Sequence, residues 1–159
     1  MKHHHYAITT KWTGNLGKGT ADYRSYNRNH VISALDKQVD IPASADPSFL
    51  GDAARYNPEE LFLSSLSSCH MLWYLHICSV NGVIVTGYTD QAKGTMEENE
   101  NGSGRFVEVI LHPVVTVANE NMVEMADQLH HQANEMCFIA NSCNFPVRHQ
   151  STAIIAVEP

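Results

Sequence analysis

Basic side chains are scarce in this sequence. Lys and Arg total 10 of the 159 residues against 17 Asp and Glu, which leaves a formal net charge of −7. Proteins that bind nucleic acid neutralise phosphates with clustered Lys and Arg, so the composition argues against such a partner. The sequence also has no basic amphipathic segment that would adsorb to a membrane surface. We therefore expect neither a nucleic acid nor a membrane as partner.

An export signal is lacking as well, because no apolar segment follows Met1, and we therefore expect a cytoplasmic protein. Cysteine is present at only four positions, which in a reducing compartment are not expected to form a disulfide framework. They are free thiols, metal ligands or redox groups. Internal repeats and linkers are absent, and the length suits one domain, so we expect residues 1–159 to fold as a single domain.

The strongest secondary-structure signal in the chain is a helix from Asn57 to Asn81. Asn57 suits the N-cap, Pro58 the first helical position, and Glu59 and Glu60 the positive end of the helix dipole. The Asn-Gly pair at residues 81–82 is typical of a helix that ends through a left-handed residue.

This helix is apolar or small on nearly every face, which predicts that it is buried. It is not expected to span a membrane, because polar residues interrupt it. These are Ser64, Ser65, Ser67, Ser68, His70 and His76.

The rest of the chain alternates between strand and helix patterns. A second helix is expected over residues 119–140, capped by Asn121 with Glu124, and its apolar stripe includes Met125, Met136 and Cys137. Strands are expected within residues 6–35 (one of them over 20–33), 83–97, 105–117 and 147–157, and residues 36–56 are expected to be irregular. Pro113 suggests an edge position or a bulge. The order β-β-α-β-β-α-β predicts an α+β fold.

Cys69 in the first helix and Cys137 on the buried face of the second are the candidates for chemistry. The residues alone leave two interpretations open. Either both cysteines only fill the core, or one reacts with a peroxide and the other condenses with the resulting sulfenic acid. A buried thiol keeps its proton, so attack requires a nearby cation. The candidate cations are Arg24, Arg28, Arg55 and His70.

The remaining cysteines and the histidines favour other roles. Cys78 should face away from Cys69 on the helix and belong to the core. Cys143 is an alternative partner for the reactive thiol. His130 and His131 point to different sides of a helix, so they cannot form the paired ligands of a zinc site, and we expect no metal.

Two segments resemble the OsmC/Ohr family of thiol-dependent hydroperoxide reductases. The run Asn-Pro-Glu-Glu-Leu-Phe at 57–62, followed by Ser-Ser-Cys-His-Met at 67–71, resembles the family signature, including the ten-residue step from Glu59 to Cys69. The second half is similar at Ala133, Asn134, Cys137, Asn144 and Val147, and the N-terminal hairpin is similar at Trp12 and residues 17–20.

This resemblance implies an OsmC-like fold, with two long central helices and flanking antiparallel sheets in an intertwined homodimer. It further implies a cysteine-based organic hydroperoxide reductase of oxidative-stress defence, with Cys69 as the peroxidatic and Cys137 as the resolving thiol. A small or lipoyl-type dithiol would reduce the resulting disulfide. No cofactor or metal is implied.

Glu59 matches the glutamate that, in the family, pairs with an arginine beside the reactive cysteine. Ten helical residues separate Glu59 from Cys69 by about 15 Å, so either the helix breaks near its start or the other subunit supplies Glu59. The arginine is expected to be Arg28, with Arg55 as the alternative. Residues 138–141, after Cys137, depart from the family's common Pro-containing run.

Two other functions compete with the enzyme. One is a non-enzymatic, stress-related dimer that binds a hydrophobic ligand between its helices, with the cysteines as lining. The other is a structural dimer whose thiols are incidental.

Overall fold

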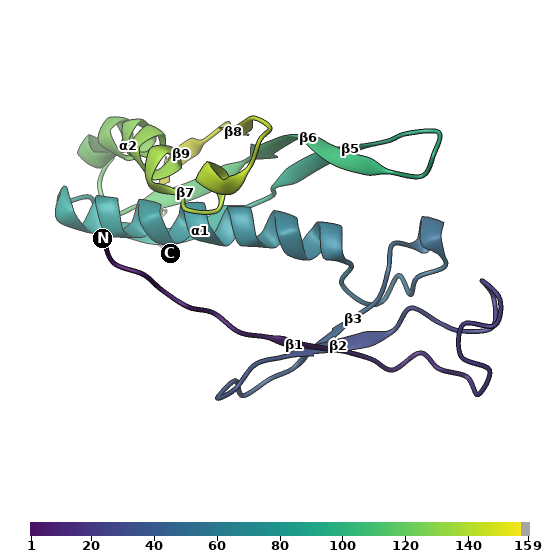
Figure 1. Cartoon of the computed structure of the whole chain (residues 1–159). Coiled ribbons are helices and arrows are strands. Elements are labelled where there is room, and N and C mark those ends of the chain that lie inside the picture. The colour runs from purple at the N-terminus through teal and green to yellow at the C-terminus, as the bar shows by residue number, and fades with distance from the viewer. Residues whose placement is uncertain (157–159) are drawn as a thin grey trace. The chain divides into compact units, whose positions relative to one another are not determined.

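The computed structural model describes residues 1–156, and its contacts divide the chain into two compact units, residues 1–62 and 63–159. The prediction of a single domain stays a prediction, and each unit is described by itself. The elements in chain order are β1 (Thr9–Trp12), β2 (His30–Ser33), β3 (Ile41–Ala43), η1 (Pro47–Phe49), α1 (Pro58–Val80), β4 (Val85–Asp90), β5 (Lys93–Glu98), β6 (Gly104–Leu111), β7 (Pro113–Val117), η2 (Glu120–Met122), α2 (Val123–Met136), η3 (Ala140–Ser142), β8 (Val147–His149) and β9 (Thr152–Ile155) (Figure 1).

Residues 1–62 contain an antiparallel sheet in the order β1-β2-β3. The strand predicted over residues 20–33 is wrong for its first ten residues. There the side chain of Arg28 donates to the carbonyls of Tyr23 and Tyr26, and the Asp22 carboxylate accepts the N–H of Arg24. Such local bonds compete with a strand ladder. The segment 36–56, expected to be irregular, contains β3 and η1.

Both ends of α1 are confirmed. Asn57 Oδ1 accepts the N–H of Glu60 at 2.8 Å, and the Glu60 carboxylate accepts the N–H of Asn57 at 3.1 Å, a reciprocal capping box. At the other end Gly82 has φ 72°, a left-handed value that favours glycine, and the Val83 N–H donates to Cys78 O at 2.9 Å. The start and stop of this helix are therefore encoded locally.

Within one chain α1 is buried along one side, so its predicted burial on nearly every face stays a prediction. Its buried positions follow one stripe, and these are Leu66, His70, Tyr74, Ile77 and Cys78. Of these, Tyr74, Ile77 and Cys78 pack into a core with side chains of β7 and α2. Leu72, on another face, is 63 % exposed. The described residues of the second unit therefore cover one side of this helix.

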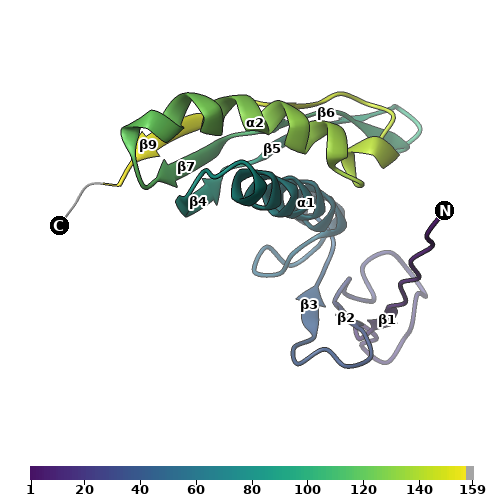
Figure 2. The same cartoon turned by 90° about the vertical axis from the view of Figure 1, so that its left-hand side faces the viewer.

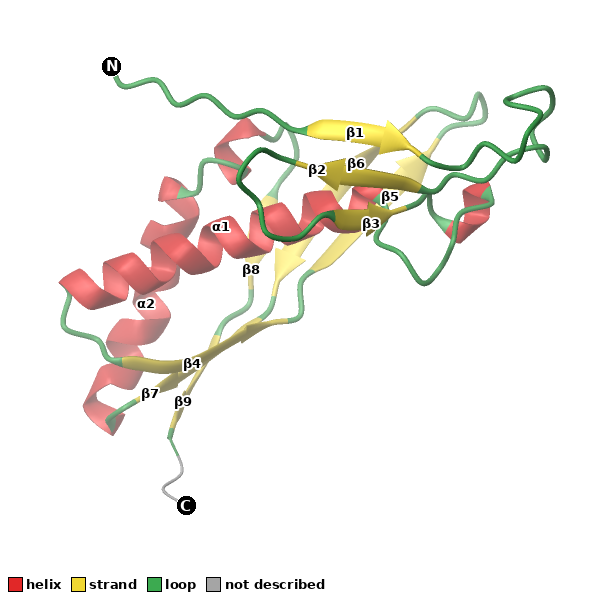
Figure 3. Ribbon diagram, turned by 90° about the horizontal axis from the view of Figure 1, so that it is seen from below, coloured by secondary structure: helices red, strands yellow, loops and turns green. Residues whose placement is uncertain are grey.

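Within the described residues, the second unit contains two three-stranded sheets, in the orders β4-β7-β9 and β5-β6-β8 (Figure 3). Each strand predicted as continuous is split between them: β4 continues into β5, β6 into β7, and β8 into β9. The pairs β6–β8 and β7–β9 are parallel, whereas β4–β7 and β5–β6 are antiparallel. The sheets of this unit are therefore mixed. Val157, where the last strand was predicted to end, lies outside the described residues.

The break between β6 and β7 is held by one carboxylate. Asp90 Oδ1 accepts the N–H of His112 at 2.7 Å, while its Oδ2 accepts the hydroxyl of Ser67 on α1. Pro113 follows as the first residue of β7, which is the central strand of its sheet. The predicted edge position is wrong, because a proline is also tolerated as the first residue of a strand.

The helix α2 lies over β7 and β9 (Figure 2). It is preceded by the 3-10 turn η2, which contains Asn121, and Met122 occupies the N-cap. The predicted cap by Asn121 and Glu124 is therefore wrong. Met125 and Met136 are exposed rather than part of the buried stripe, which consists of Ala126, Leu129, His130 and Ala133.

Candidate active site

The thiols of Cys69 and Cys137 meet between α1 and α2. Cys69 lies midway along α1, and Cys137 is the C-cap of α2, with extended dihedral angles of φ −67° and ψ 108°. The Cys69 thiol lies close enough to that of Cys137 to raise its pKa, and the Cys137 sulfur accepts the N–H of Ala140 at 3.4 Å. All four cysteines, which lie within the described residues, are free thiols.

The two thiols differ in access to solvent. Cys69 is half-buried, whereas Cys137 is 1 % exposed. Burial raises the pKa of Cys137, and the adjacent Cys69 thiol raises it further. Cys137 therefore keeps its proton at neutral pH, and a reagent from solvent meets Cys69 first.

An aromatic pair lies next to these thiols. Trp73, one turn after Cys69 on α1, meets Phe138, which directly follows Cys137, edge to face with ring centroids 5.4 Å apart. Phe138 is 67 % exposed. The approach to the thiols thus carries an apolar surface that can contact an alkyl or aryl group.

The other two cysteines take separate places. Cys78 is buried beside Tyr74 and belongs to the core, as predicted. Cys143 is half-buried after η3, and its thiol donates to the carbonyl of Ile139 at 3.2 Å.

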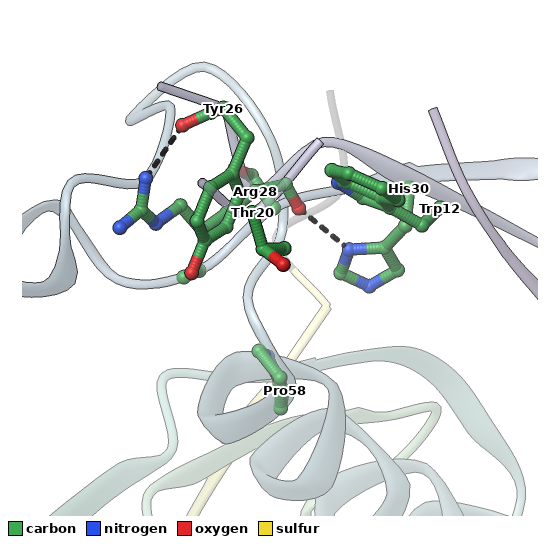
Figure 4. A pocket seen from close by; sticks show the side chains of 8 residues that line it. Trp12, Thr20, Tyr26, Arg28, His30 and Pro58 are labelled. Atoms are coloured by element: carbon green, nitrogen blue, oxygen red, sulfur yellow. Dashed lines mark hydrogen bonds between the residues drawn. The ribbon is translucent and has the colours of Figure 1, made fainter. Parts of the chain in front are cut away.

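Arg28 lines a pocket of about 360 Å³ within residues 1–62 (Figure 4). Its guanidinium lies over the rings of Tyr23 and Tyr26, 4.2 and 4.3 Å from their centroids. It also donates to their carbonyls at 2.7 and 2.6 Å. These contacts hold the cation in one orientation, and it forms no ion pair with any residue among 1–156. The pocket is lined by Trp12, Thr20, Tyr26, Arg28, His30, Ser44, Ala45 and Pro58.

The remaining predicted site residues also belong to the first unit. Arg55 is bound to Asp52 at 3.2 Å, which leaves Arg28 as the arginine better able to meet another anion. Glu59 lies in the first turn of α1, and α1 is continuous from Pro58 to Val80. The helix break considered as a way to bring Glu59 to Cys69 is thus excluded, and about 15 Å of helix axis separates the two residues.

A buried histidine pair was missed in the sequence. His70 Nε2 and His130 Nδ1 are 2.9 Å apart, and His149 of β8 lies against both rings, with centroids 5.7 Å from each. Burial, together with a smaller effect of the neighbouring histidines, lowers the pKa of His70 to about 4 and that of His130 to about 3. Both imidazoles are therefore neutral at pH 7. The signal was available, since both positions fall on the buried stripes of their helices.

Stability should fall as the pH drops below about 6.5, where histidines of the unfolded chain take up protons. The folded protein takes them up on His70 and His130 only near pH 4 and 3. Across this window the unfolded state binds more protons, so the free energy of unfolding should decrease by up to about 1.4 kcal/mol per pH unit for each histidine.

Denaturant titrations at about pH 7 and pH 5 measure this effect. His130→Gln, which removes one buried imidazole, should lose less stability between the two pH values than the wild type. The exposed His76→Gln is the control and should match the wild type. Equal losses in His130→Gln and the wild type would contradict the prediction.

The described residues contain neither a metal-ligand cluster nor a membrane-spanning helix. Among residues 1–156, no group of three or more His, Cys, Asp or Glu has an arrangement that could hold a metal ion. No helix in this described part of the chain combines the length and apolar character needed to cross a membrane.

Comparison with known proteins identifies the family. Residues 51–151 match the profile of the OsmC-like protein family. An OsmC-like protein of unknown function from Vibrio cholerae is 32 % identical, with a TM-score of 0.83 over 94 % of this chain and 99 % of its own. A comparison with curated proteins gave no match. The chain belongs to the OsmC-like family, and its α+β fold is confirmed.

More distant structures share the fold. An organic hydroperoxide resistance protein from Elizabethkingia anophelis is 20 % identical, with a TM-score of 0.66 over 96 % of this chain and 99 % of its own. Another from Legionella pneumophila is 19 % identical, with a TM-score of 0.64 over 96 % and 98 %.

Proposed function

We propose that this protein is a thiol-dependent peroxidase that reduces organic hydroperoxides to alcohols in oxidative-stress defence. The observation that carries the proposal is the contact between two free thiols of unequal burial, Cys69 and Cys137. Structures of the same fold that are described as organic hydroperoxide resistance proteins support the substrate class.

Electrons pass between these two thiols, the peroxide and a reductant. The Cys69 thiolate attacks the terminal oxygen of ROOH, the O–O bond breaks, and the alkoxide takes a proton to leave as ROH. Cys69 becomes a sulfenic acid, and Cys137 then attacks its sulfur with loss of water, which gives the Cys69–Cys137 disulfide. A small or lipoyl-type dithiol supplies the two electrons that restore both thiols.

Arg28 is the cation that stabilises the Cys69 thiolate in this mechanism, with Arg55 as the alternative. Arg28 is held by two tyrosines yet has no carboxylate partner among residues 1–156. A carboxylate that orients the guanidinium would form a bidentate pair with it. Since α1 is unbroken, we assign that role to Glu59 of the partner subunit.

The partner subunit is a second copy of this chain. Leu72 on α1 and Phe138 beside the thiols are exposed in one chain, and a homodimer would cover such apolar side chains. We expect analytical sedimentation of the protein at micromolar concentration to show a dimer. A monomer under these conditions would rule out a site completed by Glu59 of the partner subunit.

The substrate class can be tested by steady-state kinetics with a dithiol reductant. Because Trp73 and Phe138 offer apolar contact beside Cys69, kcat/KM for cumene hydroperoxide should exceed that for hydrogen peroxide by at least about tenfold. Trp73→Ala should reduce this ratio and leave turnover of hydrogen peroxide unchanged. Equal kcat/KM for both peroxides in the wild type would refute the preference for organic substrates.

A further inference from the structure

The helices that carry the two thiols are also joined at a second point by the buried pair His70–His130. His70 follows Cys69 on α1, and His130 lies about two turns before Cys137 on α2. Their ring nitrogens are 2.9 Å apart, the ring planes agree within 1°, and the centroids are 5.3 Å apart. The rings therefore meet edge to edge through one N–H···N hydrogen bond.

Tyr74 holds the same pair from the side. Its ring lies face to face on His130, with centroids 3.8 Å apart and planes within 10°. Its hydroxyl donates to the carbonyl of Ala126 at 2.9 Å, one turn before His130 on α2. His70 and Tyr74 are one turn apart on α1. Together they fix both the distance and the rotation between α1 and α2.

Stability alone does not explain why imidazoles occupy these positions. Both are fully buried or nearly so, and burying polar rings costs free energy unless every polar atom is bonded. His70 Nδ1 has no partner among the described residues. Apolar side chains at these two stripe positions would avoid that cost, but apolar contacts can slide, whereas a hydrogen bond has direction.

We propose that His70 and His130 are positioning residues that hold α1 and α2 in the register at which Cys69 and Cys137 form their disulfide. A disulfide needs an S–S distance of about 2.05 Å and a narrow range of Cα separations, so small shifts between the helices matter. Cys137 lies at the C-cap, where the chain leaves α2, and it can approach Cys69 while the histidine pair stays fixed. The inference rests on the proposed function, in which these thiols join.

The test uses a double variant, His70→Leu with His130→Leu, which removes both imidazoles. It is compared with the wild type and with the control variant His131→Gln. His131 is the exposed neighbour of His130. Each reduced protein is equilibrated with glutathione buffers, and the fraction of the Cys69–Cys137 disulfide gives the effective concentration of the two thiols. A second sample receives excess cumene hydroperoxide, and mass spectrometry measures the sulfinic acid on Cys69.

We expect the folded double variant to show an effective concentration at least about tenfold lower and more sulfinic acid, because misplacement of about 1 Å can cost two orders of magnitude in rate. His131→Gln should match the wild type. An unchanged effective concentration in the folded variant overturns the inference. If the double variant does not fold, His130→Gln is measured instead, and failure of both to fold also overturns it. A wild type that equilibrates with glutathione but ignores the peroxide refutes the proposed peroxidase alone.

Discussion

Cys69→Ser is expected to reduce dithiol-dependent peroxide consumption to the level of buffer. A serine hydroxyl is not ionised at neutral pH and cannot attack the O–O bond as a thiolate does. Cys69 is also the more accessible member of the thiol pair, since Cys137 is buried and keeps its proton. The assay follows cumene hydroperoxide and the dithiol together, so that both halves of the cycle are measured.

Cys143→Ser is the matched control for this experiment. Cys143 is half-buried and donates to the carbonyl of Ile139, a bond that a serine hydroxyl can also make. This variant should keep the activity of the wild type. If Cys69→Ser kept full activity, the thiol mechanism would be wrong, and a dimer that binds a hydrophobic ligand would become the better explanation.

Cys137→Ser is expected to react with peroxide without turning over. Cys69 would still form a sulfenic acid with the first equivalent, but no second thiol of the site would condense with it, so a second equivalent would drive Cys69 to the irreversible sulfinic acid. Peroxide consumption should therefore end after about two equivalents, with a loss of steady-state activity of at least about 10²-fold.

Mass spectrometry separates this result from a simple loss of folding. After one equivalent of peroxide, Cys137→Ser should carry one additional oxygen on Cys69, and after an excess it should carry two. Sustained turnover by this variant would show that another thiol, such as Cys143, resolves the sulfenic acid.

Features encoded by neighbouring residues could be predicted from the sequence. The capping box of Asn57 and Glu60 and the left-handed Gly82 define α1 almost to the residue. Cys69 and Cys137 could be singled out as candidates because each lies on an apolar helix pattern, and in the structure the Cys69 thiol lies close enough to raise the pKa of Cys137. The α+β class follows from the order of these patterns.

Features that depend on distant residues could not be predicted in this way. The break between β6 and β7 relies on Asp90, which bonds Ser67 on α1 and the backbone of His112. The exposed side of α1 reflects what a single chain can cover. The bond between His70 and His130 joins residues sixty positions apart.

In the proposed mechanism, Cys69 and Cys137 form a disulfide when the protein reduces an organic hydroperoxide. The most direct measurement is peptide mass spectrometry of the alkylated wild type after one equivalent of cumene hydroperoxide. The mechanism predicts a Cys69–Cys137 disulfide and an equal amount of cumyl alcohol. Both thiols still free with the peroxide intact, or a disulfide from Cys69 to Cys143, would contradict it.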